Sequence, residues 1–248
     1  MKEFLNKVVC ITGSNRGIGK ELAITFANEG ANLILCSREE NPESTEFYKE
    51  LASRYKITVY PCYFDLESDE SIKKGLSFIK SLKIKIDILV NNAGIPHLAI
   101  LPFTRISDAR RVFQVNYFAQ LMITQSLLSI MTKTGGAAII NMASIAGIDG
   151  DIGNCVYGAT KASMILFTKV LAKEVANSKI RVNAVAPGLT DTDFAITMGD
   201  KAITSMKEIS TMHRLGTAHE ISNAVLFLAS DRASFINGQV LRVDGYIK

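Results

Sequence analysis

The residues of this chain best suited to chemistry are Tyr157, Lys161 and Ser144. Residues four apart on a helix lie on the same face, so the Lys161 ammonium can approach the Tyr157 phenol. A nearby ammonium lowers a tyrosine pKa from about 10, which makes Tyr157 a candidate general acid and base. The Ser144 hydroxyl can donate to a carbonyl oxygen that gains negative charge during reduction. These residues predict a proton-transfer site for a carbonyl or an alcohol.

Tyr-x-x-x-Lys pairs also arise by chance on amphipathic helices. The surrounding sequence must therefore show whether this pair is catalytic. Directly after a predicted strand comes the sequence Thr-Gly-Ser-Asn-Arg-Gly-Ile-Gly, which begins at Thr12 and leads into an amphipathic run. In a strand, glycine turn and helix of this kind, the glycines let the backbone approach a pyrophosphate at the helix N-terminus. The predicted dinucleotide contacts in this turn are Gly13, Ser14, Asn15, Arg16, Gly17, Ile18 and Gly19.

The end of the second predicted strand indicates which dinucleotide is bound. A site selective for NAD places a carboxylate there, whereas this chain has Ser37 and Arg38, a hydroxyl and a guanidinium that suit a 2′-phosphate. Arg16 can reach the same phosphate. We therefore predict NADP(H), with NAD(H) left open because Glu39 and Glu40 follow directly.

Asp65 and Leu66 follow the third predicted strand and are also candidate cofactor contacts. The Asp65 carboxylate can accept a hydrogen bond from the adenine amino group. It can equally be the first acidic residue of the helix start over residues 65–70. The sequence supports both interpretations equally.

Short apolar runs alternate with longer helical patterns along the chain. Continuous hydrophobicity in the short runs indicates strands buried on both faces, as in a parallel sheet covered by helices. We predict a single-domain α/β fold over residues 1–248, a Rossmann-type doubly wound parallel sheet of about seven strands with helices on both faces. The segment from Leu189 to about Gly216 is predicted to be a mobile flap over the site. The predicted strands are Val8–Thr12, Leu33–Cys36, Thr58–Tyr63, Ile86–Asn91, Ala137–Met142, Arg181–Ala186 and Gln239–Val243.

The composition argues against several other classes of protein. The 248 residues carry 28 basic and 24 acidic side chains without a basic arm, so no nucleic-acid partner is expected. The N-terminus lacks an apolar leader and no run approaches about 18 apolar residues, which predicts a soluble cytoplasmic protein without a membrane partner. The four cysteines have no CxxC spacing and fit reduced thiols, and no metal site is expected.

Together these motifs resemble those of the short-chain dehydrogenases/reductases over nearly the whole chain. The resemblance extends to Asn92, Ala93 and Gly94 after the fourth predicted strand, to Asn116, and to Pro187, Gly188, Leu189 and Thr190. It implies that residues 92–94 stabilise the sheet and line the adenosine ribose, and that residues 187–190 pack on the nicotinamide. It also implies that Tyr157 and Lys161 contact the cofactor, and that Asn116 is a fourth catalytic residue holding a water linked to Lys161.

The resemblance implies hydride transfer between nicotinamide C4 and a ketone or secondary alcohol. The layout is most similar to bacterial 3-oxoacyl-[acyl-carrier-protein] reductases. Such reductases present basic residues near the active-site entrance, and this chain has Thr134-Gly135-Gly136 and Asn177-Ser178 where we expect them, which weakens the case for a carrier-protein partner. A sugar, polyol, steroid or other small ketone is an alternative substrate. A non-catalytic protein that senses NADP(H) is the alternative from another class.

The resemblance further implies a homo-oligomer, expected to be a tetramer. Two long helices, predicted around residues 108–132 and 156–177, would pair across a two-fold axis, and residues 240–248 would form a second interface. The apolar residues on these helices either cover the sheet or lie in that interface: Met122, Met131, Met164, Phe167 and Leu171.

Overall fold

The computed structural model describes residues 2–192 and 200–246. Seven parallel strands form the main sheet in the order β3-β2-β1-β4-β5-β6-β9. A further parallel pair, β7 (Thr190–Asp191) and β8 (Gly216–Thr217), lies outside it. The strands of the main sheet are β1 (Val8–Thr12), β2 (Asn32–Ser37), β3 (Val59–Tyr63), β4 (Ile88–Asn91), β5 (Ala137–Met142), β6 (Ile180–Pro187) and β9 (Val240–Val243).

Helices connect these strands and cover the sheet. They are α1 (Gly17–Asn28), α2 (Pro42–Tyr55), α3 (Asp69–Ser81), α4 (Ile106–Phe113), α5 (Ala119–Met131), α6 (Cys155–Glu174), α8 (Asp200–Ile209) and α9 (Ala218–Ala229). A π-helical turn, η2 (Gln114–Phe118), joins α4 to α5. The 3-10 turns are η1 (Leu101–Phe103), η3 (Thr132–Thr134), η4 (Ile145–Gly147), η5 (Ala176–Ser178) and η6 (Asp231–Ala233).

The predicted fold is confirmed, and the strand ends differ from the prediction by at most two residues. All residues of β4 and of β5 are buried, as expected for central strands of a parallel sheet covered on both faces. The short pair β7 and β8 was not predicted, because two-residue strands leave no periodic signal in the sequence. The first predicted long helix is interrupted by the turn η2.

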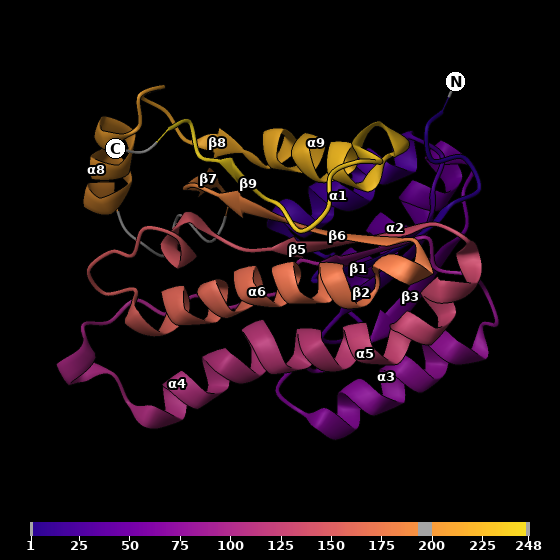
Figure 1. The fold of residues 1–248 in the computed structure, drawn as a ribbon, viewed down its shortest axis with the longest axis horizontal. Coiled ribbons are helices and arrows are strands. Elements are labelled where there is room, and N and C mark those ends of the chain that lie inside the picture. The colour runs from indigo at the N-terminus through magenta and orange to yellow at the C-terminus, as the bar shows by residue number, and fades with distance from the viewer. Residues whose placement is uncertain (1, 193–199, 247–248) are drawn as a thin grey trace.

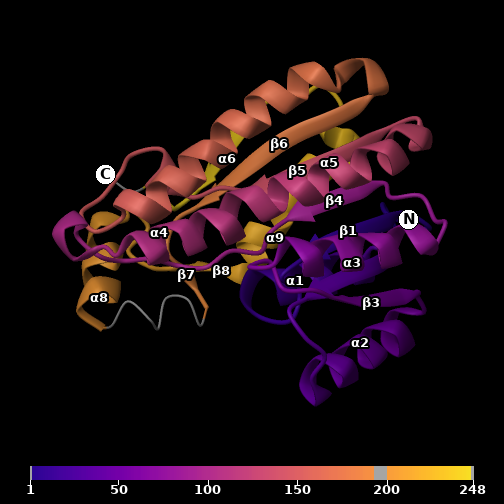
Figure 2. The same ribbon diagram turned by 90° about the horizontal axis from the view of Figure 1, so that it is seen from below.

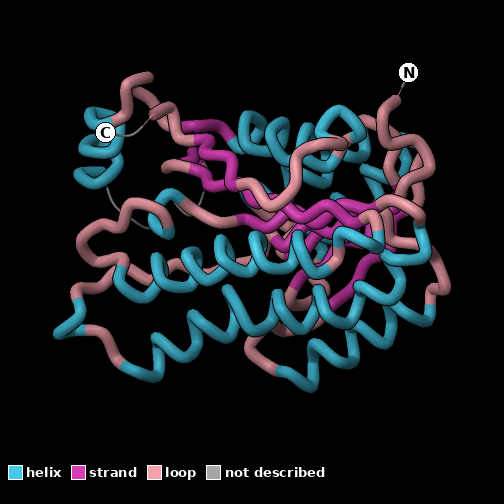
Figure 3. The backbone as a smooth tube through the Cα atoms, viewed as in Figure 1, coloured by secondary structure: helices cyan, strands magenta, loops and turns pink. Residues whose placement is uncertain are grey.

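Two apolar layers hold the sheet between the helices. One contains Leu22 and Phe26 of α1 with Ile221 and Val225 of α9. The other contains side chains of α3, α5 and α6, such as Ile123. Figure 1 shows α1 and α9 above the sheet and α3 to α6 below it, and Figure 3 shows the strands enclosed between the two helical layers.

The order of the strands reverses at β1, which pairs with β2 on one side and with β4 on the other. Chain connections therefore leave β1 and β4 toward opposite faces, and a crevice opens at the carboxyl ends of these strands. Figure 2 shows β3 and α2 at one edge of the molecule and α6 at the opposite edge. The loops that follow β1, β4 and β5 all meet at this crevice.

Among the described residues, none of the helices combines the length and apolar composition that crossing a membrane requires. Within the same residues, His, Cys, Asp and Glu side chains form no cluster of three or more suited to a metal ion. All four cysteines are unpaired.

Candidate active site

A cleft of about 1080 Å³ follows the carboxyl ends of the strands. It runs from the glycine turn after β1 to the loop after β5 and reaches Tyr246 near the C-terminus. The lining includes nearly all of the predicted cofactor contacts: Gly13, Asn15, Arg16, Gly17, Ile18, Gly19, Ser37, Arg38, Asp65, Leu66, Asn92, Ala93, Gly94, Tyr157, Lys161, Pro187, Gly188, Leu189 and Thr190.

The glycine turn is packed too tightly for side chains. A Cβ on Gly19 would lie 1.9 Å from the Gly13 carbonyl oxygen, and a Cβ on Gly13 would lie 2.9 Å from Ala93 Cα. Gly13 also has a φ of 67°, which side chains disfavour. No side chain caps the N-terminus of α1, so its first N–H groups remain available to an anion. The turn therefore fits the pyrophosphate of a dinucleotide.

Side chains from neighbouring strands hold this turn in place. Asn92 Nδ2 donates to the carbonyl oxygens of Thr12 and Gly13, at 2.9 and 3.1 Å. Ser14 keeps its cofactor contact only as a prediction. It lies outside the lining of the cleft, and its buried hydroxyl bonds to Tyr48 at 3.0 Å while its N–H donates to the Cys36 carbonyl. Ser14 therefore stabilises the glycine turn from outside the cleft.

The adenosine end of the cleft is charged. Arg38 donates to Glu67 Oε1 at 3.0 Å and lies 3.6 Å from Asp65 Oδ1. Glu67 also accepts from Arg111 of α4 at 2.7 Å. Hydrogen bonding and charge from Arg111, aided by Arg38, keep the pKa of the Glu67 carboxyl below its ordinary value. Glu67 is thus shared by two guanidiniums, and Arg38 keeps donors for a further anion.

The loop after β5 brings Ser144 to the first turns of α6. A Cβ on Gly147 would lie 2.6 Å from the Lys161 backbone, and a Cβ on Gly158 would lie 2.6 Å from the Ala146 carbonyl oxygen. These two glycines let the loop lie directly on the helix. Ser144 consequently forms a hydrogen bond with Tyr157.

Lys161 lies beside Tyr157, as the helical spacing predicts, but it does not lower the tyrosine pKa. Lys161 Nζ is 5.7 Å from the centre of the phenol ring and donates to the Met142 carbonyl at 2.8 Å. Burial raises the pKa of Tyr157 to about 12, although the bond with Ser144 acts in the opposite direction. Burial also lowers the pKa of Lys161 to about 8. The Tyr157 pKa is therefore raised rather than lowered in this structure, because loss of water outweighs the hydrogen bond with Ser144.

Asn116 lies in the π-helical turn η2 and is buried. Its Oδ1 accepts from the Ile95 N–H at 2.8 Å, and its Nδ2 donates to the Ile95 carbonyl and to Thr160 Oγ1. A Cβ on Gly94 would lie 3.3 Å from Asn116 Oδ1 and 3.5 Å from Lys161 Nζ. Gly94 therefore keeps open the space between Asn116 and Lys161, where a linking water is predicted.

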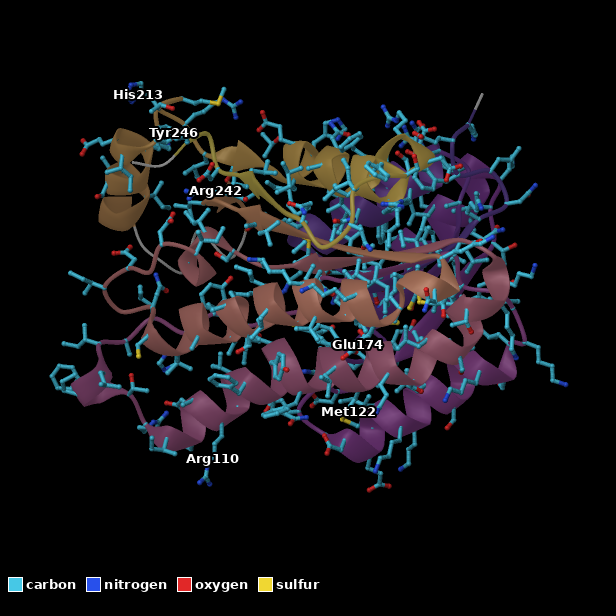
Figure 4. The ribbon with its side chains drawn as sticks, in the orientation of Figure 1. Arg110, Met122, Glu174, His213, Arg242 and Tyr246 are labelled. Carbon is cyan, nitrogen blue, oxygen red and sulfur yellow. The ribbon has the colours of Figure 1, made fainter. Side chains whose placement is uncertain are left out.

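The remaining wall of the cleft comes from segments far apart in the sequence. A Cβ on Gly188 would lie 2.8 Å from Asp244 Cα, so this glycine lets β6 and the C-terminal segment approach closely. Figure 4 shows Arg242 and Tyr246 at the end of the molecule that carries α8. Of the predicted flap over residues 189–216, Leu189, Thr190, Thr192 and Ile209 line the cleft. Residues 193–199 lie outside the described residues, so the flap's mobility stays a prediction.

Four further charged or titratable residues line the cleft: His97, Arg111, Asp149 and Arg242. These residues belong to no sequence motif, because only the tertiary fold brings each of them to the cleft. Conversely, Gly135 and Asn177, at the expected carrier-protein positions, lie next to the N-terminal ends of β5 and β6. The cleft opens at the carboxyl ends, so within one subunit these positions are remote from it.

Known proteins share this arrangement. Residues 13–246 match the family model described as enoyl-(acyl carrier protein) reductase. The chain is 37% identical over 239 residues to the 3-oxoacyl-[acyl-carrier-protein] reductase of Aquifex aeolicus, with 96% of each covered. It is 36% identical over 243 residues to the 3α-hydroxysteroid dehydrogenase of Mediterraneibacter gnavus, covering 97% of this chain and 96% of that protein.

The structure of L-sorbose reductase from Gluconobacter frateurii, complexed with NADPH and L-sorbose, is similar with a TM-score of 0.93 and 29% identity. The likeness covers 100% of this chain and 98% of the sorbose reductase. With the matched family model and relatives above 30% identity, the protein is a member of the short-chain dehydrogenase/reductase family, oxidoreductases that interconvert carbonyls and alcohols.

Proposed function

We propose that this oxidoreductase uses NADPH to reduce the ketone of a 3-oxoacyl thioester to a secondary alcohol. The observation that carries the proposal is the hydrogen bond between Ser144 and Tyr157 with Lys161 beside it, inside a cleft that begins at a dinucleotide-type turn. The substrate class follows the relatives, because the 3-oxoacyl reductase of Aquifex aeolicus is similar over 96% of both chains.

The cleft residues are suited to NADP(H). The glycine turn and the uncapped start of α1 would hold the pyrophosphate, and Ser37, Arg38 and Arg16 would hold the 2′-phosphate. Asp65 and Leu66 would face the adenine. NAD(H) is the alternative, because Glu39 also lines this end.

Further along the cleft, residues 92–94 would line the adenosine ribose, and Tyr157 and Lys161 would contact the nicotinamide ribose. Pro187, Gly188, Leu189 and Thr190 would pack on the nicotinamide. When bound, the cofactor supplies the hydride for the carbonyl carbon.

The four proposed catalytic residues have separate tasks. Ser144 would donate to the ketone oxygen as negative charge develops, and Tyr157 would give that oxygen its proton. A phenol with a pKa of about 12 keeps its proton at neutral pH, which is the form a proton donor needs. Lys161 would bear a positive charge beside the phenol and would be re-protonated through a water held near Asn116.

The test is NADPH oxidation by the purified protein with acetoacetyl thioesters, presented on coenzyme A and on acyl carrier protein. L-sorbose and a 3-oxo steroid complete the panel, because relatives or similar structures act on a sugar and on a steroid. We expect turnover of the thioesters, and more with NADPH than with NADH. Turnover confined to the sugar or the steroid would overturn the substrate assignment. No turnover on any carbonyl would support a protein that senses NADP(H).

Recognition of a carrier protein would need basic side chains near the cleft. The basic side chains nearest the expected positions, Lys133 and Lys179, adjoin the N-terminal ends of β5 and β6. A second subunit would have to bring them near a cleft. Equal kcat/KM for coenzyme A and carrier-protein thioesters would show that the carrier is not recognised.

We also propose a homotetramer. Of the apolar residues predicted to lie either on the sheet or in an interface, Met131, Met164 and Leu171 are buried within the subunit. The exposed apolar residues of the helical face are Phe103, Ile106, Phe118, Leu166 and Val170, and those near the C-terminus are Phe235, Leu241 and Tyr246. Large exposed apolar residues of this kind favour subunit interfaces.

Sedimentation would test this assembly against the subunit mass of 27.1 kDa. We expect a species of four subunits that Leu166→Glu dissociates. A wild-type protein sedimenting as a monomer at micromolar concentration would contradict the proposal. The unpaired cysteines support a reducing compartment, and we propose the cytoplasm as its location.

A further inference from the structure

The Glu67 carboxylate lies beside the adenosine end of the cleft, between two guanidiniums from distant parts of the chain. Its Oε1 atom accepts from Arg38 Nη2 at 3.0 Å. The same oxygen contacts Arg111 at 2.9 Å from Nε and 2.7 Å from Nη2. Arg38 and Arg111 both line the cleft. Because Arg38 is proposed to bind the 2′-phosphate, a carboxylate that competes for its donors affects the choice of cofactor.

Arg111 binds Glu67 more closely than Arg38 does. Two Arg111 nitrogens contact Oε1, both at shorter distances than the Arg38 contact. The hydrogen bond from Arg111 is the main cause that keeps the pKa of the Glu67 carboxyl below its ordinary value, and Arg38 contributes less. A guanidinium has five N–H groups, so the single bond to Glu67 leaves Arg38 with donors for an anion.

The backbone that carries Glu67 is bound to the π-helical turn η2. Gln114 Nε2 donates to the Leu66 carbonyl at 3.3 Å and to Asp69 Oδ1 at 2.8 Å. These two contacts lie on either side of Glu67 in the sequence, so the freedom left to this residue is mainly that of its side chain. The two arginine side chains therefore decide where the carboxylate is held.

We propose that Arg111 and Glu67 set the preference for NADPH over NADH: Arg111 holds the Glu67 carboxylate and thereby leaves the Arg38 guanidinium free for the 2′-phosphate. This inference rests on the proposed contact between Arg38 and that phosphate. Without Arg111, Glu67 would form a closer pair with Arg38 and would repel the phosphate from its donors. Arg111 is thus a positioning residue that acts through Glu67. NADH has no 2′-phosphate, so its binding depends little on this arrangement.

Substitutions at both residues test the proposal in fluorescence titrations at physiological ionic strength. Glu67→Gln keeps an acceptor oxygen and removes the charge, so NADPH should bind about fivefold more tightly. Arg111→Leu should weaken NADPH by about the same factor, while NADH changes by less than about twofold in either variant. In the double variant the loss caused by Arg111→Leu should disappear, because no carboxylate remains to neutralise Arg38.

Arg110→Leu is the matched control for loss of charge. It removes one positive charge from the neighbouring position of α4, and Figure 4 shows Arg110 extending outward from that helix. Its affinity for both dinucleotides should equal that of the wild type. A selective loss of NADPH in Arg111→Leu would then come from the contact with Glu67 and not from the net charge of the protein.

A ligand without nicotinamide locates the effect along the cleft. Adenosine 2′,5′-bisphosphate carries the 2′-phosphate and the adenosine alone, and calorimetry measures its affinity. Glu67→Gln should tighten it and Arg111→Leu should weaken it, by the same factors as for NADPH. An affinity for this ligand that does not change in either variant would place the effect away from the 2′-phosphate and overturn the proposal.

The titrations separate this inference from the function on which it rests. Equal losses of NADPH and NADH in Arg38→Leu would refute the contact with the 2′-phosphate, and the role of Glu67 with it. Where Arg38→Leu selectively weakens NADPH, that contact stands, and the variants of Glu67 and Arg111 decide the inference. Unchanged or weaker NADPH binding by Glu67→Gln would overturn it. A loss from Arg111→Leu that is equal with and without the Glu67 charge would overturn it as well.

Discussion

Arg242 on β9 forms an ion pair with Asp149 in the loop that follows Ser144, with 2.8 Å between Nη2 and Oδ2. The same guanidinium binds Asp244 at 2.6 Å. The C-terminal segment continues the connection, because the Gly245 carbonyl accepts from Thr211 Oγ1 at 2.8 Å, just after α8. One arginine thus links the C-terminal segment beside α8 to the loop carrying the proposed catalytic serine.

Arg242→Gln should destabilise the protein and loosen substrate binding. The Asp244 side chain is only 7% exposed, so losing its charged partner should cost about 1–3 kcal/mol. For a chain of this size that lowers Tm by about 2–4 °C per kcal/mol. Asp149→Asn should cost less, because the Asp149 side chain is 50% exposed. Thermal unfolding, with KM for the carbonyl substrate, measures both effects.

The control for this pair is Arg54→Gln. Arg54 pairs with Glu50 at 3.9 Å on the exposed surface of α2, where an ion pair contributes little. Its Tm and KM should match the wild type. An Arg242→Gln protein that unfolds at the wild-type temperature with unchanged KM would show that the link has no role.

Tyr157→Phe should abolish most of the turnover while NADPH still binds. Loss of the only proposed proton donor should lower kcat by about 10²- to 10⁴-fold. Ser144→Ala should lower kcat by about 10²- to 10³-fold, because the ketone oxygen loses a donor. Stopped-flow NADPH oxidation measures kcat, and NADPH fluorescence verifies binding. Near-normal turnover by Tyr157→Phe would rule out the phenol as proton donor.

Lys161→Met should produce a more stable, inactive protein at neutral pH. Burial holds the Lys161 pKa at about 8 rather than 10.5, so below pH 8 the folded protein carries a charge that folding disfavours. That difference in pKa corresponds to about 3 kcal/mol. The Met142 carbonyl loses its partner in the variant, at a cost of about 1 kcal/mol, which leaves a gain of about 2 kcal/mol.

The stability of the wild type relative to Lys161→Met should change with pH in a defined direction. Between pH 8 and 10.5 the unfolded chain still binds the Lys161 proton that the folded chain has released, so the wild type gains stability as the pH rises. The advantage of Lys161→Met should therefore be constant below pH 8 and shrink above it. Urea unfolding of both proteins at several pH values measures this difference. An advantage that does not change with pH would indicate that burial of the charge is not its cause.

Arg38→Leu should weaken NADPH far more than NADH. A guanidinium that binds the 2′-phosphate through charge-assisted bonds should contribute about 10- to 100-fold in affinity. Arg111→Leu should also weaken the binding of NADPH more than that of NADH, but by a smaller factor than Arg38→Leu. In that variant the charge of Glu67 would neutralise Arg38 alone. Fluorescence titrations with both dinucleotides measure the selectivity, and Arg105→Leu, whose exposed side chain pairs with Asp108, is the control. Equal losses for NADPH and NADH would exclude a contact with the 2′-phosphate.

Features that depend on neighbouring residues could be predicted from the sequence. The apolar runs of β1, β4 and β5 identify buried strands because a parallel sheet covered on both faces needs them. The glycine turn follows from backbone geometry. Tyr157 and Lys161 share a face of α6 because helical spacing places them there.

Features that join distant segments became visible only in the fold. Arg242 and Asp149 are 93 residues apart, and Arg111 and Glu67 are 44 apart. No local pattern encodes such pairs, since the sheet order and the loops above it decide which side chains meet.

Among the proposed catalytic residues, the pKa of Tyr157 shows the same difference between what the sequence predicts and what only the fold determines. The sequence by itself determined that a tyrosine, a lysine and a serine could act together in a dinucleotide-binding fold. Only the tertiary structure decided that burial would raise the Tyr157 pKa and lower that of Lys161, because desolvation depends on everything packed around a group.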